Sequence, residues 1–239
     1  MSSYAHPASV SGGISIRSPL LRVASDERLI VLIRRGREDA FEVLVERYRP
    51  RLVAFCQNML RSPEDAEDVM QEVMVSAHRA IRADDRQIVV KPWLYRIARN
   101  RCLNHMRRVQ PIALDTMDEF TALGAVSAPE KVERSEQLRE IVADVKRLPE
   151  SQQTALLLRE MEGLPYAQIA EVLDTTVPSV KSLLVRARVG LAEAAEARTL
   201  TCPQAASAAA DRAATEAERR AARRHLRECG DCGARVAAA

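Results

Sequence analysis

The sequence predicts an all-α protein built from several small helical units. Aromatic residues make up only 3% of the 239 residues and there are eight glycines, a composition that favours helices around small cores. Apolar residues also recur at three- and four-residue steps, the period of an amphipathic helix. The clearest case is the stretch 163–191, which predicts a short helix, a tight turn at Asp174, Thr175 and Thr176, and a second, basic helix.

The second helix of this stretch has the character of a DNA-reading helix. Its apolar face is predicted to pack inward, while small polar and basic side chains lie on or beside the outward face, at Ser179, Lys181, Ser182, Arg186 and Arg188. Such a helix can enter the major groove of DNA. Two amphipathic helices of an ordinary bundle are the alternative. The coincidence of turn, small residue (Ala170) and basic face favours DNA binding.

Composition narrows the class of protein further. The formal net charge is only +3, so the total charge does not by itself imply a polyanion partner. No apolar run is long enough to span a membrane, and the first residues lack the pattern of a signal peptide, so residues 1–25 are interpreted as a disordered tail. Five cysteines without an export signal predict a reducing cytoplasm, in which a cysteine cluster indicates a metal or redox site.

Residues 26–108 are predicted to form a first helical domain. A long apolar stripe over 41–59 is expected to bend or break at Pro50, and Ser62 followed by Pro63 predicts the start of the next helix. That helix carries a polar, largely acidic ridge at Asp65, Asp68, Gln71 and Glu72. On charge pattern alone, a solvated face is the favoured interpretation of the ridge.

A polar loop over 82–92 leads to the predicted helix 93–108, which contains no acidic residue. Its candidate nucleic-acid contacts are Trp93, Arg96, Arg99, Asn100, Arg101, Asn104, Arg107 and Arg108. Basic groups neutralise phosphates and aromatic rings can stack on unpaired bases. The alternative is that Trp93 belongs to the core and the arginines are solvated.

Residues 109–135 contain three chain-breaking residues and several acids, and are predicted to be an acidic linker between domains. Residues 136–198 then form a second helical domain that ends in the helix-turn-helix. Residues 199–239 differ in composition and form a predicted small helical module.

The final module holds a candidate metal site at Cys202, His225, Cys229 and Cys232. Three thiolates and one imidazole complete a tetrahedral zinc site. A single helix would hold Cys202 and His225 about 35 Å apart, so the chain must reverse, and Thr215 with Glu218 forms a capping box that can start the returning helix. The alternatives are a metal-free Cys229/Cys232 redox pair and an unstructured tail. Because the module buries almost nothing larger than alanine, we expect it to unfold without metal.

Taken together, residues 26–198 resemble an extracytoplasmic-function (ECF) sigma factor of bacterial RNA polymerase. The motifs are DAEDVMQEVMVSAHRAI, WLYRIARNRCLNHMRR and LPESQQTALLLREMEGLPYAQIAEVLDTTVPSVKSLLVRARVGL, and they occur in family order. The resemblance implies that the acidic ridge faces the clamp helices of the polymerase β′ subunit. This reverses the solvated-face interpretation.

The resemblance also implies how promoter DNA is bound. The first domain would be sigma region 2, whose 82–91 loop receives a flipped base of the minus-ten element while the Trp93 helix follows the opened strand. The second would be sigma region 4, docking its recognition helix on the minus-thirty-five element. A stress-response role is expected, a separate anti-sigma partner is a further hypothesis, and no bond-making chemistry is expected.

The motif HLRECGDC resembles that of zinc-binding anti-sigma domains, here fused to the sigma factor itself. One hypothesis is that the module regulates the sigma factor in cis, by packing on one of its domains or by gating polymerase binding. Oxidation of zinc-bound thiolates would make it a redox switch. A structural appendage or a docking site for another regulator is the alternative.

Two other classes of protein remain as alternatives for the whole chain. A helix-turn-helix repressor or activator would bind duplex DNA without polymerase, and would need neither the acidic ridge nor the Arg/Trp helix. An enzyme would need a catalytic constellation, and the sequence offers no convincing nucleophile–base pair or phosphate-binding glycine loop.

Overall fold

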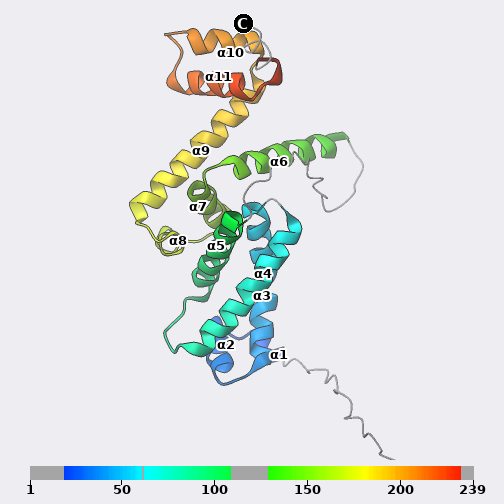
Figure 1. Cartoon of the computed structure of the whole chain (residues 1–239), viewed down its shortest axis with the longest axis vertical. Coiled ribbons are helices and arrows are strands. Elements are labelled where there is room, and N and C mark those ends of the chain that lie inside the picture. The colour runs from blue at the N-terminus through cyan, green and yellow to red at the C-terminus, as the bar shows by residue number, and fades with distance from the viewer. Residues whose placement is uncertain (1–18, 61, 109–128, 233–239) are drawn as a thin grey trace, which may run out of the picture.

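The computed structural model describes residues 19–60, 62–108 and 129–232, and every regular element in these ranges is a helix (Figure 1). The all-α prediction is confirmed. The helices are α1 (Pro19–Arg22), α2 (Asp26–Arg34), α3 (Glu38–Met59), α4 (Pro63–Ala83), α5 (Val90–Arg108), α6 (Pro129–Arg147), α7 (Glu150–Glu160), α8 (Tyr166–Leu173), α9 (Val177–Thr199), α10 (Cys202–Ala210) and α11 (Glu216–Glu228).

Helices α2 to α5 form the N-terminal unit, packed around one apolar core. Tyr95 of α5 is fully buried and meets Phe55 of α3 edge to face, with ring centroids 5.2 Å apart. Cys56 and Cys102 lie in the same core, where their mutual hydrogen bond and burial raise the pKa of the Cys102 thiol. Cys56 therefore acts as a small apolar residue, as its place on the apolar stripe predicts.

The starts of the helices follow from local capping, but Pro50 does not break α3. The Ser62 hydroxyl accepts a hydrogen bond from the Asp65 backbone N–H at 3.2 Å, as expected for the start of α4. Helix α3 continues through Pro50. The proline is exposed, while Tyr48 and Leu52 on either side are buried in one core, so packing holds the helix together across the missing hydrogen bond.

Two predicted boundaries are wrong, because helical structure begins earlier in the chain than the sequence predicts. Residues 19–25 belong to the expected disordered tail, yet α1 forms and Leu21 is buried. The Arg47 guanidinium on α3 holds this segment, donating to the carbonyl oxygens of Arg22 at 3.0 Å and Ala24 at 2.8 Å. Helix α5 begins at Val90 rather than residue 93, so the loop is shorter than expected and Pro92 sits in the first turn, where it costs no hydrogen bond.

Helices α6 to α9 form the middle unit. Helix α6 begins at Pro129, within the predicted linker, and the rest of that linker, like residues 1–18, lies outside the described residues. Leu158, Ile169 and Leu184 of α7, α8 and α9 are almost fully buried together, which holds the helix-turn-helix against α7.

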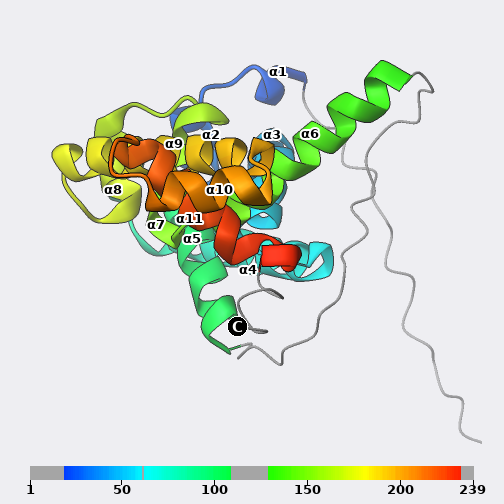
Figure 2. The same cartoon turned by 90° about the horizontal axis from the view of Figure 1, so that it is seen from above.

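Helix α9 does not end with the recognition surface but continues to Thr199 and carries the C-terminal module (Figure 1). Within the module, α10 and α11 lie side by side and α11 packs on α9, as the view from above shows (Figure 2). Thr215 and Glu218 form the reciprocal capping box predicted for the returning helix. The fully buried side chains of these two helices are Ala205, Ala221 and Ala222, so the small core is also confirmed.

Among the described residues, no helix combines the length and apolar character needed to cross a membrane.

We predict that Phe55→Ala lowers the free energy of unfolding of the N-terminal unit by about 3–5 kcal/mol, because it leaves a cavity beside Tyr95. Val75→Ala is the control, since Val75 on α4 is 49% exposed and its truncation should cost about 0.5 kcal/mol or less. Urea unfolding followed by fluorescence of Trp93, the single tryptophan, measures both. Equal effects of the two substitutions would contradict this description of the core.

Candidate nucleic-acid interface and metal centre

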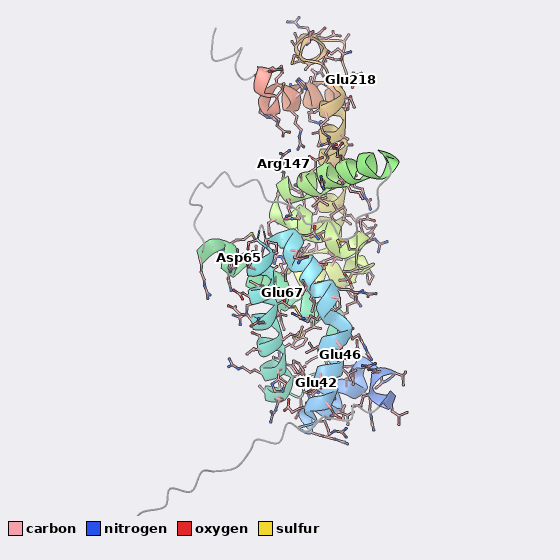
Figure 3. All side chains as sticks on the ribbon, turned by 90° about the vertical axis from the view of Figure 1, so that its right-hand side faces the viewer. Glu42, Glu46, Asp65, Glu67, Arg147 and Glu218 are labelled. Atoms are coloured by element: carbon pink, nitrogen blue, oxygen red, sulfur yellow. The ribbon has the colours of Figure 1, made fainter. Side chains whose placement is uncertain are left out.

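The predicted acidic ridge lies along α4, and its four residues divide between two surroundings. Asp65, labelled in Figure 3, is half-buried, and its Oδ2 lies 3.3 Å from His105 Nε2 on α5. Glu72 is exposed and its Oε2 lies 3.3 Å from Arg101 Nη1. Asp68 and Gln71 are exposed, and Asp68 forms no ion pair with any other residue that the structure describes. The ridge therefore presents Asp68 and Gln71 to an external partner, while Asp65 and Glu72 also contact α5.

The basic residues of α5 point in several directions. Arg101 turns back to α4, where it also donates to the Ser76 hydroxyl at 2.8 Å. Asn104, Arg107 and Arg108 are exposed near the end of the helix. Trp93 is half-buried against the core, so it belongs partly to the core and partly to the surface. The helix offers a basic surface, but not one in which all the predicted residues share a face.

A cavity of about 540 Å³ opens at the N-terminal end of α5. The loop between α4 and α5 forms one wall and the first turns of α5 form the other. Its lining combines apolar, aromatic and polar side chains, among them Asp84, Arg86, Gln87, Ile88, Trp93, Arg96 and Asn100. Its volume lies in the range typical of small-molecule pockets. The cavity therefore has the size and the mixed chemistry needed to hold a nucleobase.

Arg34 of α2 holds the wall of this cavity in place. Its guanidinium donates to three carbonyl oxygens, those of Ile81 at 3.2 Å, Asp85 at 3.3 Å and Arg86 at 2.6 Å. The first lies in the last turn of α4, where carbonyl groups lack partners within the helix. The Asp84 carboxylate adds an internal tie by accepting from the Arg86 backbone N–H at 2.8 Å. The loop is thus held both by Arg34 of α2 and by a hydrogen bond between two of its own residues.

Helices α7 and α8 of the middle unit cover part of α5. Arg99 forms a bidentate pair with Glu150 of α7, with contacts of 2.8 and 3.2 Å. Lys91 donates to the Glu162 backbone carbonyl oxygen at 2.6 Å, and its Nζ lies 3.3 Å from Glu162 Oε2, whose side chain is buried. Glu171 of α8 lines the cavity beside Trp93. Two basic groups near the candidate nucleic-acid surface are therefore paired with acids of the middle unit.

The helix-turn-helix has the geometry that its sequence predicts. Asp174 adopts a left-handed conformation with φ 52°, which ends α8, and the Thr176 hydroxyl caps α9 by accepting from the Ser179 backbone N–H. Lys181, Ser182 and Arg186 are exposed on α9. Ser179 is half-buried in the first turn, whereas Arg188 is exposed but pairs with Glu160 of α7 at 2.7 Å. The outward face is thus available along the first three turns.

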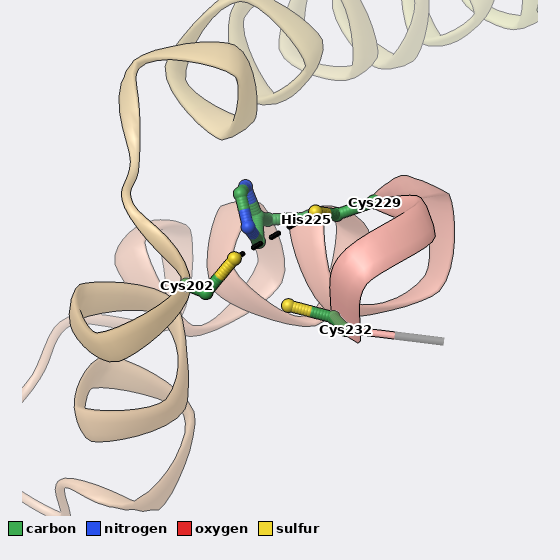
Figure 4. Close-up of side chains that lie close together, drawn as sticks. All are labelled: Cys202, His225, Cys229 and Cys232. Carbon is green, nitrogen blue, oxygen red and sulfur yellow. Dashed lines mark hydrogen bonds between the residues drawn. The ribbon is translucent and has the colours of Figure 1, made fainter. Parts of the chain in front are cut away.

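The four predicted metal ligands come together in the C-terminal module. Their candidate ligand atoms all lie within 4.8 Å of one another, although Cys202 starts α10 while the other three come from α11 and the turn after it (Figure 4). Cys202 Sγ and Cys229 Sγ are 3.7 Å apart. Spacing alone predicted this cluster, and the chain reversal brings it about. The arrangement is able to bind a metal ion.

Two further features fit a metal at this cluster. The His225 ring bonds through Nδ1 to the Ala197 carbonyl oxygen at 2.9 Å, while its Nε2 is buried without a protein partner. A ring held at one nitrogen and unpaired at the other is typical of a metal-ligating histidine. The Cys232 backbone N–H lowers the pKa of the Cys229 thiol to about 7, so much of this ligand is already thiolate at neutral pH. Burial raises the pKa of Cys232 instead.

Sequence reasoning did not single out several residues that organise these sites. Arg34 and Glu150 lie far in sequence from the groups they hold, and Asp144, buried on α6, looked like an ordinary polar position within a helix. Their partners depend on how the helices cross, and no local sequence pattern predicts that. The only sequence feature that marks these residues is an acid or an arginine in an amphipathic helix, and many solvated residues share this feature.

We predict that Glu150→Lys loosens the contact between the N-terminal and middle units, because it sets a cation against Arg99. Loss of this half-buried pair should shift the equilibrium between packed and separated units by about 2 kcal/mol, or roughly 30-fold. Quenching of Trp93 fluorescence by acrylamide should increase, since Trp93 lines the cavity that α8 covers.

The matched control is Glu67→Lys, which removes a pair with Arg49 inside the N-terminal unit. It should leave Trp93 quenching unchanged. If Glu150→Lys also leaves quenching and the radius of gyration in solution unchanged, the Arg99–Glu150 pair does not hold the two units together.

Comparison with known proteins agrees with this geometry. The chain matches the family model Sigma-70 region 2 over residues 44–111 and Sigma-70, region 4 over residues 138–191. It is 34% identical to the ECF RNA polymerase sigma-E factor of Escherichia coli (strain K12) over 174 residues, covering 69% of this chain and 91% of the relative. The sigma-E factor of Haemophilus influenzae is 35% identical over 174 residues, with 69% and 92% covered.

Two solved structures share the fold. CnrH in complex with the cytosolic domain of CnrY matches with a TM-score of 0.57 and 22% identity, covering 73% of this chain and 99% of that one. The sigma factor RpoE in complex with the anti-sigma factor NepR from Bartonella quintana matches with a TM-score of 0.54 and 21% identity, covering 65% and 96%. Family models, relatives and fold agree, and the chain belongs to the ECF sigma factors of bacterial RNA polymerase.

Proposed function

We propose that this sigma factor binds core polymerase through α4, recognises promoter DNA through α5 and α9, and carries a zinc-binding module that acts in cis. The observation that supports this most strongly is the juxtaposition of two surfaces on the N-terminal unit. A largely exposed acidic ridge on α4 lies beside a basic helix whose first turns line a base-sized cavity. A repressor that acts on duplex DNA alone has no use for this combination.

The polymerase-binding surface would be the ridge of Asp65, Asp68, Gln71 and Glu72, facing the clamp helices of the β′ subunit. Asp68 and Gln71 would make the central contacts because they are exposed. Asp65 and Glu72 would also orient the ridge through His105 and Arg101.

The cavity beside Trp93 would receive a base of the minus-ten element. Extracting a base costs a few kcal/mol, which a fitted pocket and phosphate contacts must offset. Trp93 offers a stacking face, and Arg96 and Asn100 offer donors on the same side of α5. Arg34 would keep the opposite wall in position without touching the DNA.

The minus-thirty-five element would be read by the outward face of α9. Ser179, Lys181, Ser182 and Arg186 lie along its first turns, where a recognition helix meets base edges. Arg188 would reach a phosphate only after leaving Glu160.

Promoter engagement would require the two DNA-binding units to separate. Arg99 cannot contact a phosphate while it holds Glu150, and Glu171 occupies the edge of the base-binding cavity. Core polymerase would offer each unit its own binding site and so favour the separated state. An anti-sigma factor, the partner named for RpoE of Bartonella quintana, would be a second regulator.

The domain limits follow from this assignment. Residues 26–108 would be sigma region 2, 109–135 the linker, 136–198 sigma region 4 and 199–239 the zinc module. Helix α6, which starts at Pro129, would extend region 4 towards the linker.

The metal would be zinc, held by the thiolates of Cys202, Cys229 and Cys232 and by His225 Nε2. The ion would supply structural cross-linking, since three thiolates and one imidazole complete the tetrahedral set that zinc favours in closed sites. The fully buried side chains of α10 and α11 are all alanines, and they offer little apolar burial to replace it. A redox role for the thiolates remains a prediction.

Run-off transcription with core polymerase from a matched promoter tests the sigma activity. The wild-type chain should initiate, and Asp68→Lys should weaken core binding roughly tenfold or more, because it reverses a charge on the proposed contact surface. Glu67→Lys, the same change on the adjacent residue, should initiate normally because that side chain pairs with Arg49 of α3. A folded chain that binds its promoter but never initiates would favour the repressor alternative.

Zinc binding has its own test. The purified chain should hold one zinc per molecule, and Cys229→Ser should abolish stoichiometric binding. Chelation should remove the helical circular-dichroism signal of α10 and α11. Zinc affinity should also fall as pH decreases below about 7, because protons then compete with zinc for the Cys229 thiolate, whose pKa is about 7. A chain that retains its full helicity after complete removal of metal would contradict the structural role.

A further inference from the structure

Asp144 of α6 is a buried carboxylate on which arginines from three helices converge. Only 4% of its side chain is exposed. Arg198 of α9 donates to Oδ2 at 2.5 Å, while Arg224 of α11 and Arg147 of α6 lie 3.7 and 3.8 Å from Oδ1. A buried carboxylate is costly unless cations and donors surround it. Asp144 is therefore one of the points at which the C-terminal module joins region 4, and the one that links α6, α9 and α11.

The same turn of α11 carries the metal ligand and the arginine that reaches Asp144. His225 bonds to the Ala197 carbonyl oxygen of α9, and the neighbouring Arg224 also donates to the Gly190 carbonyl oxygen at 3.1 Å. Arg147, labelled on α6 in Figure 3, lies 3.8 Å from Glu228 of α11. The position of α11 thus determines how fully Asp144 is neutralised.

Four of the five arginines of α11 have partners within the chain. Arg220 donates to Glu193 of α9 at 2.5 Å, Arg223 to Glu216 at 2.9 Å, and Arg219 to carbonyl oxygens of the turn before α11. The module also lies at the far end of α9 from the helix-turn-helix (Figure 1). It is therefore placed to act on the framework of region 4 and not on its DNA-reading face.

We propose that the metal state of the module is transmitted to α6 through the Arg224–Asp144 contact, which makes Asp144 a positioning residue for region 4. This inference depends on the proposed zinc binding. With metal, the four ligands hold α11 so that Arg224 neutralises Asp144. Without it, the fully buried apolar side chains that hold α11 on α10 are all alanines, so α11 shifts, Arg224 moves away from Asp144, and Asp144 keeps Arg198 as its close partner.

Loss of the Arg224–Asp144 contact would make α6 more mobile. This helix carries Ile141, Val142 and Val145, which form one wall of an apolar groove of about 570 Å³ against Leu157 of α7 and Leu191 of α9. Few other contacts hold the wall, because Leu138 and Ile141 are more than half exposed. Metal release would change the mobility of α6 and hence the width of this groove, while the recognition helix stays folded.

The test measures zinc affinity and hydrogen exchange in the full-length chain. Coupling between two sites is reciprocal, so if zinc orders α6, removing the Asp144 charge must weaken zinc binding although Asp144 is no ligand. We expect Asp144→Asn to lower zinc affinity about tenfold, measured by competition with a chromogenic chelator. Chelation of the wild-type chain should speed amide exchange in α6 about tenfold, and in Asp144→Asn this dependence on zinc should disappear.

Two further variants distinguish loss of the Arg224–Asp144 contact from a general loss of folding. Arg224→Gln removes the same contact from the module side, leaves Arg198 on Asp144, and should also abolish the effect of zinc on α6. Glu193→Gln breaks a different pair between α11 and α9, and should leave the effect on α6 intact.

The outcomes separate this inference from the proposed function. The proposed coupling is wrong if the wild-type chain binds zinc but chelation does not change the rate of amide exchange in α6. It is also wrong if both Asp144→Asn and Arg224→Gln bind zinc with wild-type affinity. In either case the proposed zinc site is unaffected. If the wild-type chain binds no zinc at all, the proposed metal site fails and the coupling fails with it.

Discussion

The burial of one face of α5 is the constraint on which the rest of the structure depends. Leu94, Tyr95, Ala98 and Cys102 are fully buried against the neighbouring helices of the N-terminal unit, so the helix cannot rotate about its axis. Its remaining residues must then face α4, the middle unit or solvent. The acidic ridge, the base-sized cavity and the contact with region 4 all take their positions from this single packed face.

The ion pairs that join region 2 to region 4, and region 4 to the C-terminal module, differ in burial. Regions 2 and 4 are joined by ion pairs as well as by apolar packing, and the Arg99–Glu150 pair is partly solvated, so Arg99 can exchange Glu150 for a phosphate at modest cost. The attachment of the C-terminal module through Asp144 and Arg224 is more deeply buried than the Arg99–Glu150 pair. The structure therefore joins its units by contacts of different burial, and the more solvated one suits the separation proposed for promoter binding.

Much of the architecture could be predicted because its signals are local. The caps at Ser62 and Thr215, the left-handed turn at Asp174 and the apolar stripe of α9 are each set within a few residues. Distant contacts decide the outcome where a local rule leaves it open or is overruled. Of the bend or break predicted at Pro50, the break is absent, because one core packs both flanks of α3. Residues 19–25, predicted to be disordered, include α1 and are held by Arg47, which binds carbonyl oxygens of this segment.

By itself, the sequence determined the helical class, the chemistry of the outward face of α9 and the four candidate metal ligands, because periodicity, capping and ligand spacing act over short distances. Only the tertiary structure decided that Arg34 anchors the cavity wall, that Glu150 covers Arg99, and that Asp144 joins α6, α9 and α11. Those partners lie far apart along the chain. Their meeting depends on how helices cross, and the same residue types on a solvated helix would look no different in sequence.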